Sequence, residues 1–151
     1  MSAPDDHEVR LLLASRFASI AIAERALADL CVEAGCDTDD EFWVMTALRE
    51  ALANAIRHGN HENPARKVAA ALRLSGDRVE VRVDDEGEGF DPAAVPDPTG
   101  PEQLLEPRGR GIFYMRQFMN RVEYGRTAAG GTSVLMVREV KTGARSSHDE
   151  E

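Results

Sequence analysis

The chain has 151 residues, a length that suits one domain with a hydrophobic core of its own. Its formal net charge of -9 argues against nucleic acid as the main partner, because contacts with phosphates need a basic surface. The longest apolar runs are far too short to cross a bilayer and no secretory signal opens the chain, so we expect a cytoplasmic protein without membrane contact.

The first elements are a strand and a helix. Residues 1–7 are polar and expected to be disordered, and residues 8–14 can form the strand. Ser15 is a suitable N-cap for a helix that continues to about residue 32. The two cysteines are too few for a disulfide framework or a zinc site; we expect Cys31 in the core and Cys36 at the surface, and assign neither a role.

Residues 39–60 predict one long amphipathic helix. Thr38, Asp39 and Asp40 supply N-capping oxygens, and Gly59 is suited to a left-handed C-cap. Apolar side chains recur at intervals of three and four residues, which gives a stripe that can face a core. The stripe consists of Phe42, Met45, Leu48, Leu52, Ala55 and Ile56.

The same helix carries a second row of side chains, Glu50, Asn54 and His58, spaced four residues apart. Residues at this spacing lie along one line of a helix, and here small residues flank the line. A carboxylate one turn before a carboxamide suggests the wall of a cleft. On its own, however, the row is more typical of a solvated face, and its weight comes from motifs further along the chain.

The second half of the chain predicts two hairpins separated by a long loop. Most of the prolines lie in that loop, and so long a loop in a compact domain is more often functional than not. The predicted elements are strands at 68–74 and 78–84, the loop at 85–111, a short helix at 111–119, strands at 121–124 and 132–140, and a disordered tail at 141–151.

This order of elements predicts an α+β fold. Helices that precede a run of strands favour a two-layer α/β sandwich, in which a mixed, mostly antiparallel sheet is covered by helices on one face. The folded domain is expected to span residues 8–140.

Two glycine motifs flank the long loop. Asp85-Glu86-Gly87-Glu88-Gly89 follows a strand, and its glycines let the backbone approach a ligand closely. Gly109-Arg110-Gly111 precedes the short helix, whose N-terminal amides can receive phosphate oxygens. Either motif alone is weak evidence, and an ordinary turn explains the first one better. Neither is a Walker A loop, because no GK[ST] follows.

In combination, the motifs resemble the GHKL family of ATP-binding domains, which includes histidine-kinase catalytic domains, gyrase B and MutL. The matching stretches are EALANAIRHGN, DEGEGFDP, RGRGIFYMRQFMNRVEY and GGTSVLM. Within that family the chain is most similar to the small bacterial anti-sigma factor serine/threonine kinases of the RsbW and SpoIIAB type. The resemblance extends over roughly residues 8–140 and implies the Bergerat ATP-binding fold.

The resemblance implies a role for each motif residue, with ATP and Mg²⁺ as the ligands. Asn54 would coordinate Mg²⁺ through its amide oxygen, and Glu50 would be the general base. Asp85 would accept a hydrogen bond from the adenine amino group. The other residues that the resemblance places around the nucleotide are Gly87 and Gly89 beside the base, Thr132 at the adenine end through a water, and Arg108, Gly109, Arg110 and Gly111 near the phosphates, with residues 92–108 as a mobile lid.

His58 has two interpretations of equal weight. The anti-sigma kinases carry histidine at this place, which implies a role near the nucleotide. An imidazole at a helix end can instead simply interact with the helix dipole. The chain also departs from the family at Asn120, where aspartate is common, and at Arg108, where a further glycine is frequent.

Three functions follow from these observations. The first is a protein serine/threonine kinase that holds a sigma factor and phosphorylates a STAS-type antagonist of the anti-sigma factor. The second is a binding module that switches partners with ATP or ADP without catalysis. The third is a detached histidine-kinase catalytic domain, ranked last because no dimerisation helix with an acceptor histidine is recognisable. The resemblance also implies a homodimer formed near the N-terminal strand, and partner contacts on the first helix at Glu24 and Arg25.

Overall fold

The computed structural model describes residues 6–88 and 115–141. Predictions for Gly89, for residues 92–108, for Arg108 to Gly111 and for both ends of the chain lie outside this part. The strands are β1 (His7–Ala14), β2 (Lys67–Ser75), β3 (Arg78–Asp84), β4 (Arg121–Arg126) and β5 (Thr132–Glu139). The helices are α1 (Ile20–Ala34), preceded by the 3₁₀ turn η1 (Phe17–Ser19), and α2 (Thr38–Asn54), which continues into the π-helical turn η2 (Ala55–Gly59). Residues 115–118 are also helical.

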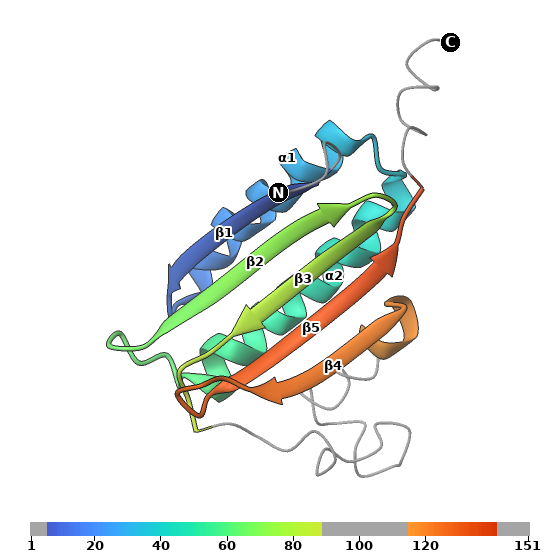
Figure 1. Ribbon diagram of the computed structural model, residues 1–151. Coiled ribbons are helices and arrows are strands. Elements are labelled where there is room, and N and C mark those ends of the chain that lie inside the picture. The colour runs from blue at the N-terminus through green and yellow to red at the C-terminus, as the bar shows by residue number, and fades with distance from the viewer. Residues whose placement is uncertain (1–5, 89–114, 142–151) are drawn as a thin grey trace, which may run out of the picture.

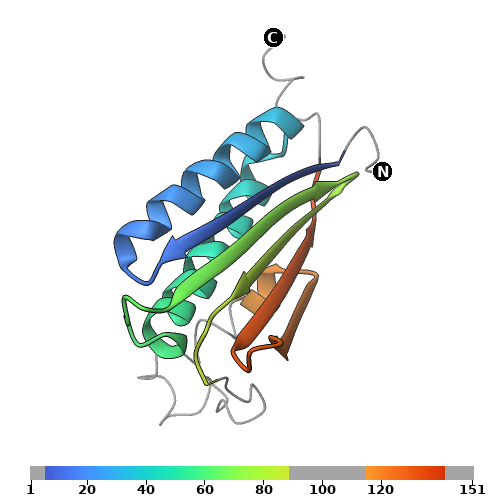
Figure 2. The same cartoon turned by 60° about the vertical axis from the view of Figure 1, so that its left-hand side comes forward.

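The strands form one sheet in the order β1-β2-β3-β5-β4, and α1 and α2 lie side by side on one of its faces (Figures 1 and 2). This confirms the predicted two-layer α+β sandwich. All neighbouring pairs of these strands are antiparallel, so the expectation of a mixed sheet was too broad. The reason is that two successive helices return the chain to the end of the sheet where β1 stops, and β2 must then run the opposite way.

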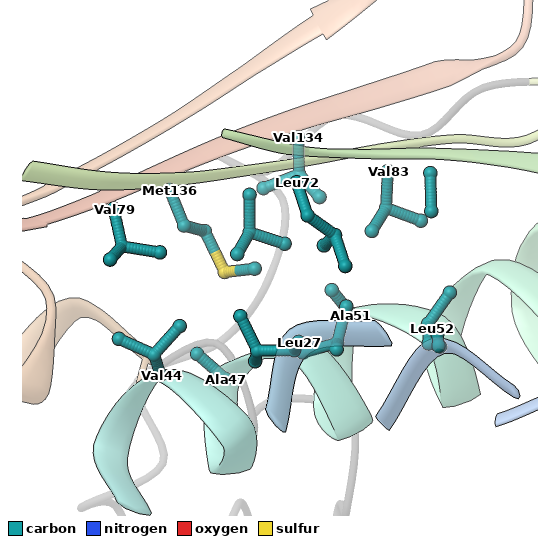
Figure 3. Close-up of a cluster of buried hydrophobic side chains, with 14 of the residues drawn as sticks. Leu27, Val44, Ala47, Ala51, Leu52, Leu72, Val79, Val83, Val134 and Met136 are labelled. Atoms are coloured by element: carbon teal, nitrogen blue, oxygen red, sulfur yellow. The ribbon is translucent and has the colours of Figure 1, made fainter. Parts of the chain in front are cut away.

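The core lies between α2 and the inner face of the sheet. Alternate residues of β3, including Val79 and Val83, are buried because side chains along a strand point to opposite faces. They face Val44, Ala47 and Ala51 of α2 across the layer (Figure 3). Two alanines on this face of the helix let its backbone lie close to the sheet.

The apolar stripe of α2 was predicted only in part. Leu48, Leu52 and Ile56 are buried, but Phe42 is 57% exposed. At 100° per residue, Phe42 lies about 120° around the helix from Leu48, so it points away from the sheet. The small residue Ala47, which was expected to border the row of polar side chains, is instead part of the core.

The helix ends also differ from the prediction. Asp37 caps α2, since its carboxylate accepts a hydrogen bond from the Asp39 amide at 2.8 Å. Ser15 caps no helix; its hydroxyl donates to the Arg66 carbonyl at 2.5 Å. Gly35 ends α1 in the left-handed conformation, whereas Gly59 does not adopt the left-handed conformation predicted for it. Cys36 is buried and not at the surface.

A polar cluster joins the start of α2 to the end of β5. Asp40 and Arg138 form an ion pair at 3.0 Å, with their side chains only 13% and 20% exposed. The second carboxylate oxygen of Asp40 accepts a hydrogen bond from the Lys141 amide at 2.8 Å. Arg138 also donates to the Phe118 carbonyl, and the Phe118 ring stacks on Trp43 with 3.7 Å between the ring centroids. Residues 115–118 are thereby attached to α2.

No helix within residues 6–88 or 115–141 has the length and apolar character needed to span a membrane.

Candidate functional site

A pocket lies between the C-terminal part of α2 and the sheet, next to the point where β3 ends and β5 begins. Its walls bring together four residues that the sequence singled out: Asn54, His58, Asp85 and Thr132. The remaining lining residues are Ala51, Ala55, Gly59, Val83, Tyr124 and Val134. The helical wall and the sheet wall of the pocket therefore each contribute both apolar and polar residues.

The turn η2 shapes the helical wall of this pocket. The Asn60 amide donates to the Ala55 carbonyl at 2.8 Å, which is a bond to the fifth preceding residue in place of the fourth. Such π turns are rare and are frequently found at functional sites. Glu50 and Asn54 remain one α-helical turn apart on α2, whereas His58 lies in the wider turn that follows.

The carboxylate of Asp85 is held by the backbone around it. Its Oδ1 accepts hydrogen bonds from the amides of Gly87 at 3.0 Å and Thr132 at 2.9 Å. The Asp85 amide donates to the Thr132 carbonyl at 2.9 Å, so the end of β3 is tied to the start of β5. Asp85 is only 6% exposed, and its Oδ2 accepts no hydrogen bond from any described residue. One oxygen of the carboxylate is thus held by two backbone amides and the other lies next to Gly59, while Asp85 itself lines the pocket.

Three glycines surround Asp85 at distances that exclude a side chain. A Cβ atom on Gly59 would lie 2.1 Å from Oδ2 of Asp85, and one on Gly131 would lie 2.1 Å from the Asp85 carbonyl oxygen. A Cβ atom on Gly87 would lie 2.0 Å from the Gly59 carbonyl oxygen. Gly87 thus has no room for a side chain because the Gly59 backbone lies against it, and its approach to a ligand stays a prediction. Gly59 is required for the same reason, and not as a helix cap.

Glu50 is half-buried on α2, one turn before Asn54, and does not itself line the pocket. Burial raises the pKa of its carboxyl group above the usual value, and the positive charge of Arg57 offsets this only in part. A carboxylate whose proton affinity has been raised is a better general base.

The donor set of the pocket suits a magnesium ion that is shared with phosphates. Among the described residues, no group of three His, Cys, Asp or Glu side chains could hold a metal by itself. Mg²⁺ is usually bound through one or two protein oxygens, with waters and phosphate oxygens completing its shell. The amide oxygen of Asn54, at the pocket wall, fits that pattern.

Two residues at the site were missed from the sequence. Tyr124 lies opposite Val134 in the β4–β5 pair and lines the pocket from the far strand. The alternation of the short β4 segment was its only signal. Asn60 appeared to be part of a turn, but its side chain is completely buried.

Comparison with known proteins places the chain in a family. Residues 13–138 match the histidine kinase-like ATPase domain. An anti-sigma F factor of Oceanobacillus iheyensis is 32% identical over 137 residues, which cover 89% of this chain and 93% of that protein. The serine-protein kinase RsbW of Staphylococcus epidermidis is 25% identical over 147 residues, which cover 93% of this chain and 90% of the kinase.

Solved structures share the fold. The RsbU and RsbW domains of a Mycobacterium tuberculosis protein superpose with a TM-score of 0.62 at 21% identity, covering 92% of this chain and 34% of that one. The SiaB–SiaC complex of Pseudomonas aeruginosa contains a chain that superposes with a TM-score of 0.65 at 16% identity, covering 85% of this chain and 88% of the other. On the sequence matches, the chain belongs to the histidine kinase-like ATPase family, among the anti-sigma factors and RsbW-type kinases.

Proposed function

We propose that this protein binds ATP with Mg²⁺ in the pocket at the end of α2 and transfers the γ-phosphate to a serine or threonine of a STAS-type antagonist. We further propose that it is a cytoplasmic anti-sigma factor, which holds a sigma factor until its antagonist displaces it. The observation that carries the proposal is the carboxylate of Asp85, which is fixed through Oδ1 and leaves Oδ2 for a donor in the pocket.

Adenine fits this acceptor. An ionised carboxylate can only accept hydrogen bonds, and adenine presents an amino group whereas guanine presents a carbonyl oxygen at the same position. Val83, Val134 and Ala51 supply apolar surface for the flat faces of a base. The three close glycines around Asp85 leave its position little freedom, which favours selection of one base.

Asn54 and Glu50 have separate roles in the phosphate transfer. Mg²⁺, when bound through Asn54, would neutralise charge on the phosphates. The hydroxyl oxygen of the substrate attacks the γ-phosphorus, and the bond from that phosphorus to the β,γ-bridging oxygen breaks as ADP leaves. The hydroxyl proton passes to Glu50, whose raised pKa suits this role. His58, which also lines the pocket, would contact the phosphate end.

The relatives support the regulatory role, since one group is named anti-sigma F factor and the other serine-protein kinase. On α1, Arg25 is exposed and, among the described residues, forms an ion pair only with Asp29 on the same helix, which suits a partner contact. Glu24 is paired with Arg49 of α2 at 2.7 Å and suits that role less well. For the homodimer we propose the surface near β1, where Leu12 is 73% exposed.

The decisive experiment is a phosphotransfer assay with the purified protein, γ-labelled ATP, Mg²⁺ and the STAS partner. We expect acid-stable phosphate on the partner, and a Glu50→Gln variant that still binds ATP but transfers about 10²–10⁴-fold more slowly. ATP binding without transfer by the wild type would favour the non-catalytic switch. Acid-labile phosphate on a histidine would favour a detached histidine-kinase domain. A wild type that does not bind ATP would overturn the whole proposal.

A further inference from the structure

Asn60 is completely buried, and its side chain joins three separate segments of the chain. Its Nδ2 donates to the Ser15 hydroxyl at 2.9 Å and to the Lys67 carbonyl at 3.0 Å. Its Oδ1 accepts a hydrogen bond from the Glu86 amide at 2.8 Å. Both amide hydrogens and the carbonyl oxygen of the side chain are thus used, as is required of a polar group without access to water.

The bond to Glu86 reaches the turn that carries the nucleotide acceptor. Glu86 follows Asp85 directly, and the Glu86 side chain is itself fixed, because it accepts a hydrogen bond from the Lys67 amide at 3.0 Å. Asn60 follows Gly59, whose Cα lies against Oδ2 of Asp85. Asn60 therefore connects the two segments that pack against each other at Asp85, the end of η2 and the turn after β3.

We infer that Asn60 is a positioning residue for nucleotide selection, an inference that rests on the proposed ATP binding. It touches no ligand-facing group itself. By holding the Glu86 amide, it keeps the Asp85–Gly87 turn against Gly59, so that Oδ2 of Asp85 stays at one place in the pocket. The precision of base recognition then depends on a residue behind the pocket wall.

The test is the ratio of the dissociation constants for GTP and ATP, measured by calorimetry on the full chain. In Asn60→Ser the bond to Glu86 is lost, and we expect the preference for ATP to fall about tenfold, since one net hydrogen bond corresponds to about that factor. A purely structural role would lower the unfolding temperature and leave this ratio unchanged.

Ser15→Ala is the matched control. It removes two other bonds of the same network, to the Arg66 carbonyl and from Nδ2 of Asn60, but keeps the bond between Asn60 and Glu86. We expect it to destabilise the fold without altering the GTP-to-ATP ratio. Equal loss of selectivity in the two variants, or unchanged selectivity in Asn60→Ser, would overturn the inference. A wild type that binds neither nucleotide would instead refute the proposed function.

If Asn60→Ser does not fold, hydrogen exchange of the Glu86 amide in the wild type gives the answer. Saturating ATP and Mg²⁺ should slow this exchange, because ligand and network would stabilise the same turn. Exchange at an unchanged rate would contradict the role assigned to Asn60.

Discussion

At the scale of single residues, the site depends on how one carboxylate is divided between the fold and the pocket. In Asp85→Asn, the side-chain amide can still accept bonds from the Gly87 and Thr132 amides, but it then presents an NH₂ group where Oδ2 was. Two donors would face each other, so we expect ATP affinity to fall about 10- to 100-fold. Isothermal titration calorimetry measures this change.

Asp84→Asn provides the control for that experiment. Asp84 is the last residue of β3, and its carboxylate pairs with Arg82 at 3.3 Å, outside the pocket. ATP affinity within about twofold of the wild type is expected, in line with the small effect of a partly exposed ion pair. Equal weakening by both variants would show that general loss of charge, and not the position of Asp85, governs binding.

A substitution at Gly59 tests how closely this residue packs against Asp85. Its replacement by alanine brings a methyl group into the space of Oδ2 of Asp85, and we expect a loss of about 1–3 kcal/mol in unfolding free energy together with weaker ATP binding. In Gly125→Ala, where no atom lies within 4 Å of the new Cβ, we expect a change within about 0.5 kcal/mol. Urea denaturation distinguishes them, and a tolerated Gly59→Ala would contradict the close packing.

The raised pKa of Glu50 also makes the stability of the fold depend on pH. Because its pKa is raised on folding, the native state holds more protons than the unfolded state just above pH 4.5. Stability of the wild type therefore falls as pH rises through this window. Glu50→Gln removes the effect, so we expect the variant to be the more stable protein at pH 7, with its advantage disappearing below pH 4.5. Denaturant titrations across pH 4–8 check this, and an advantage that is independent of pH would disprove the assignment to Glu50.

At the scale of elements, the Asp40–Arg138 pair attaches the end of β5 and residues 115–118 to the start of α2. In Arg138→Met a buried carboxylate loses its charged partner, which typically costs about 3–5 kcal/mol. The control, Arg121→Met, removes an exposed pair with Glu123 and should cost about 0–1 kcal/mol. Urea denaturation compares the two variants, and a loss of similar size in both would mean that the buried pair adds nothing.

The elements themselves were largely predictable, because patterns with a period of 2 residues in strands and 3.6 residues in helices follow directly from their geometry. β2, β3, β5 and the body of α2 were found in this way. The π turn at 55–59 was not, since it keeps the composition of an α-helix and differs only in hydrogen bonding. For the same reason, Gly59 was given the commoner role of a helix cap.

At the scale of the whole molecule, the pocket is assembled from segments far apart in the sequence, from Ala51 on α2 to Val134 on β5. A ligand that binds there should stabilise the whole domain. At 100 times its dissociation constant, ATP with Mg²⁺ should add about 2.7 kcal/mol to the unfolding free energy. Thermal denaturation measures this gain. A 10- to 100-fold weaker Asp85→Asn variant should keep only about 0.4–1.4 kcal/mol of it at the same ATP concentration. Stabilisation undiminished by the substitution would place the nucleotide elsewhere.

Four residues singled out from the sequence line one pocket: Asn54, His58, Asp85 and Thr132. They could be chosen because their residue types and spacing are conspicuous in sequence, and their roles toward a nucleotide stay predictions. Tyr124 and Asn60 could not be identified from the sequence, because their importance comes from tertiary contacts. Tyr124 lines the pocket from the edge strand β4, and Asn60 is buried behind the pocket wall.

Trp43 is the only tryptophan in the chain, and its indole lies flat against the ring of Phe118. The tryptophan fluorescence of the protein therefore comes from one place, where residues 115–118 contact the N-terminal part of α2. Any nucleotide, partner or substitution that parts those two rings would alter the emission of the unlabelled protein. The molecule thus contains a built-in optical probe for the attachment of that segment.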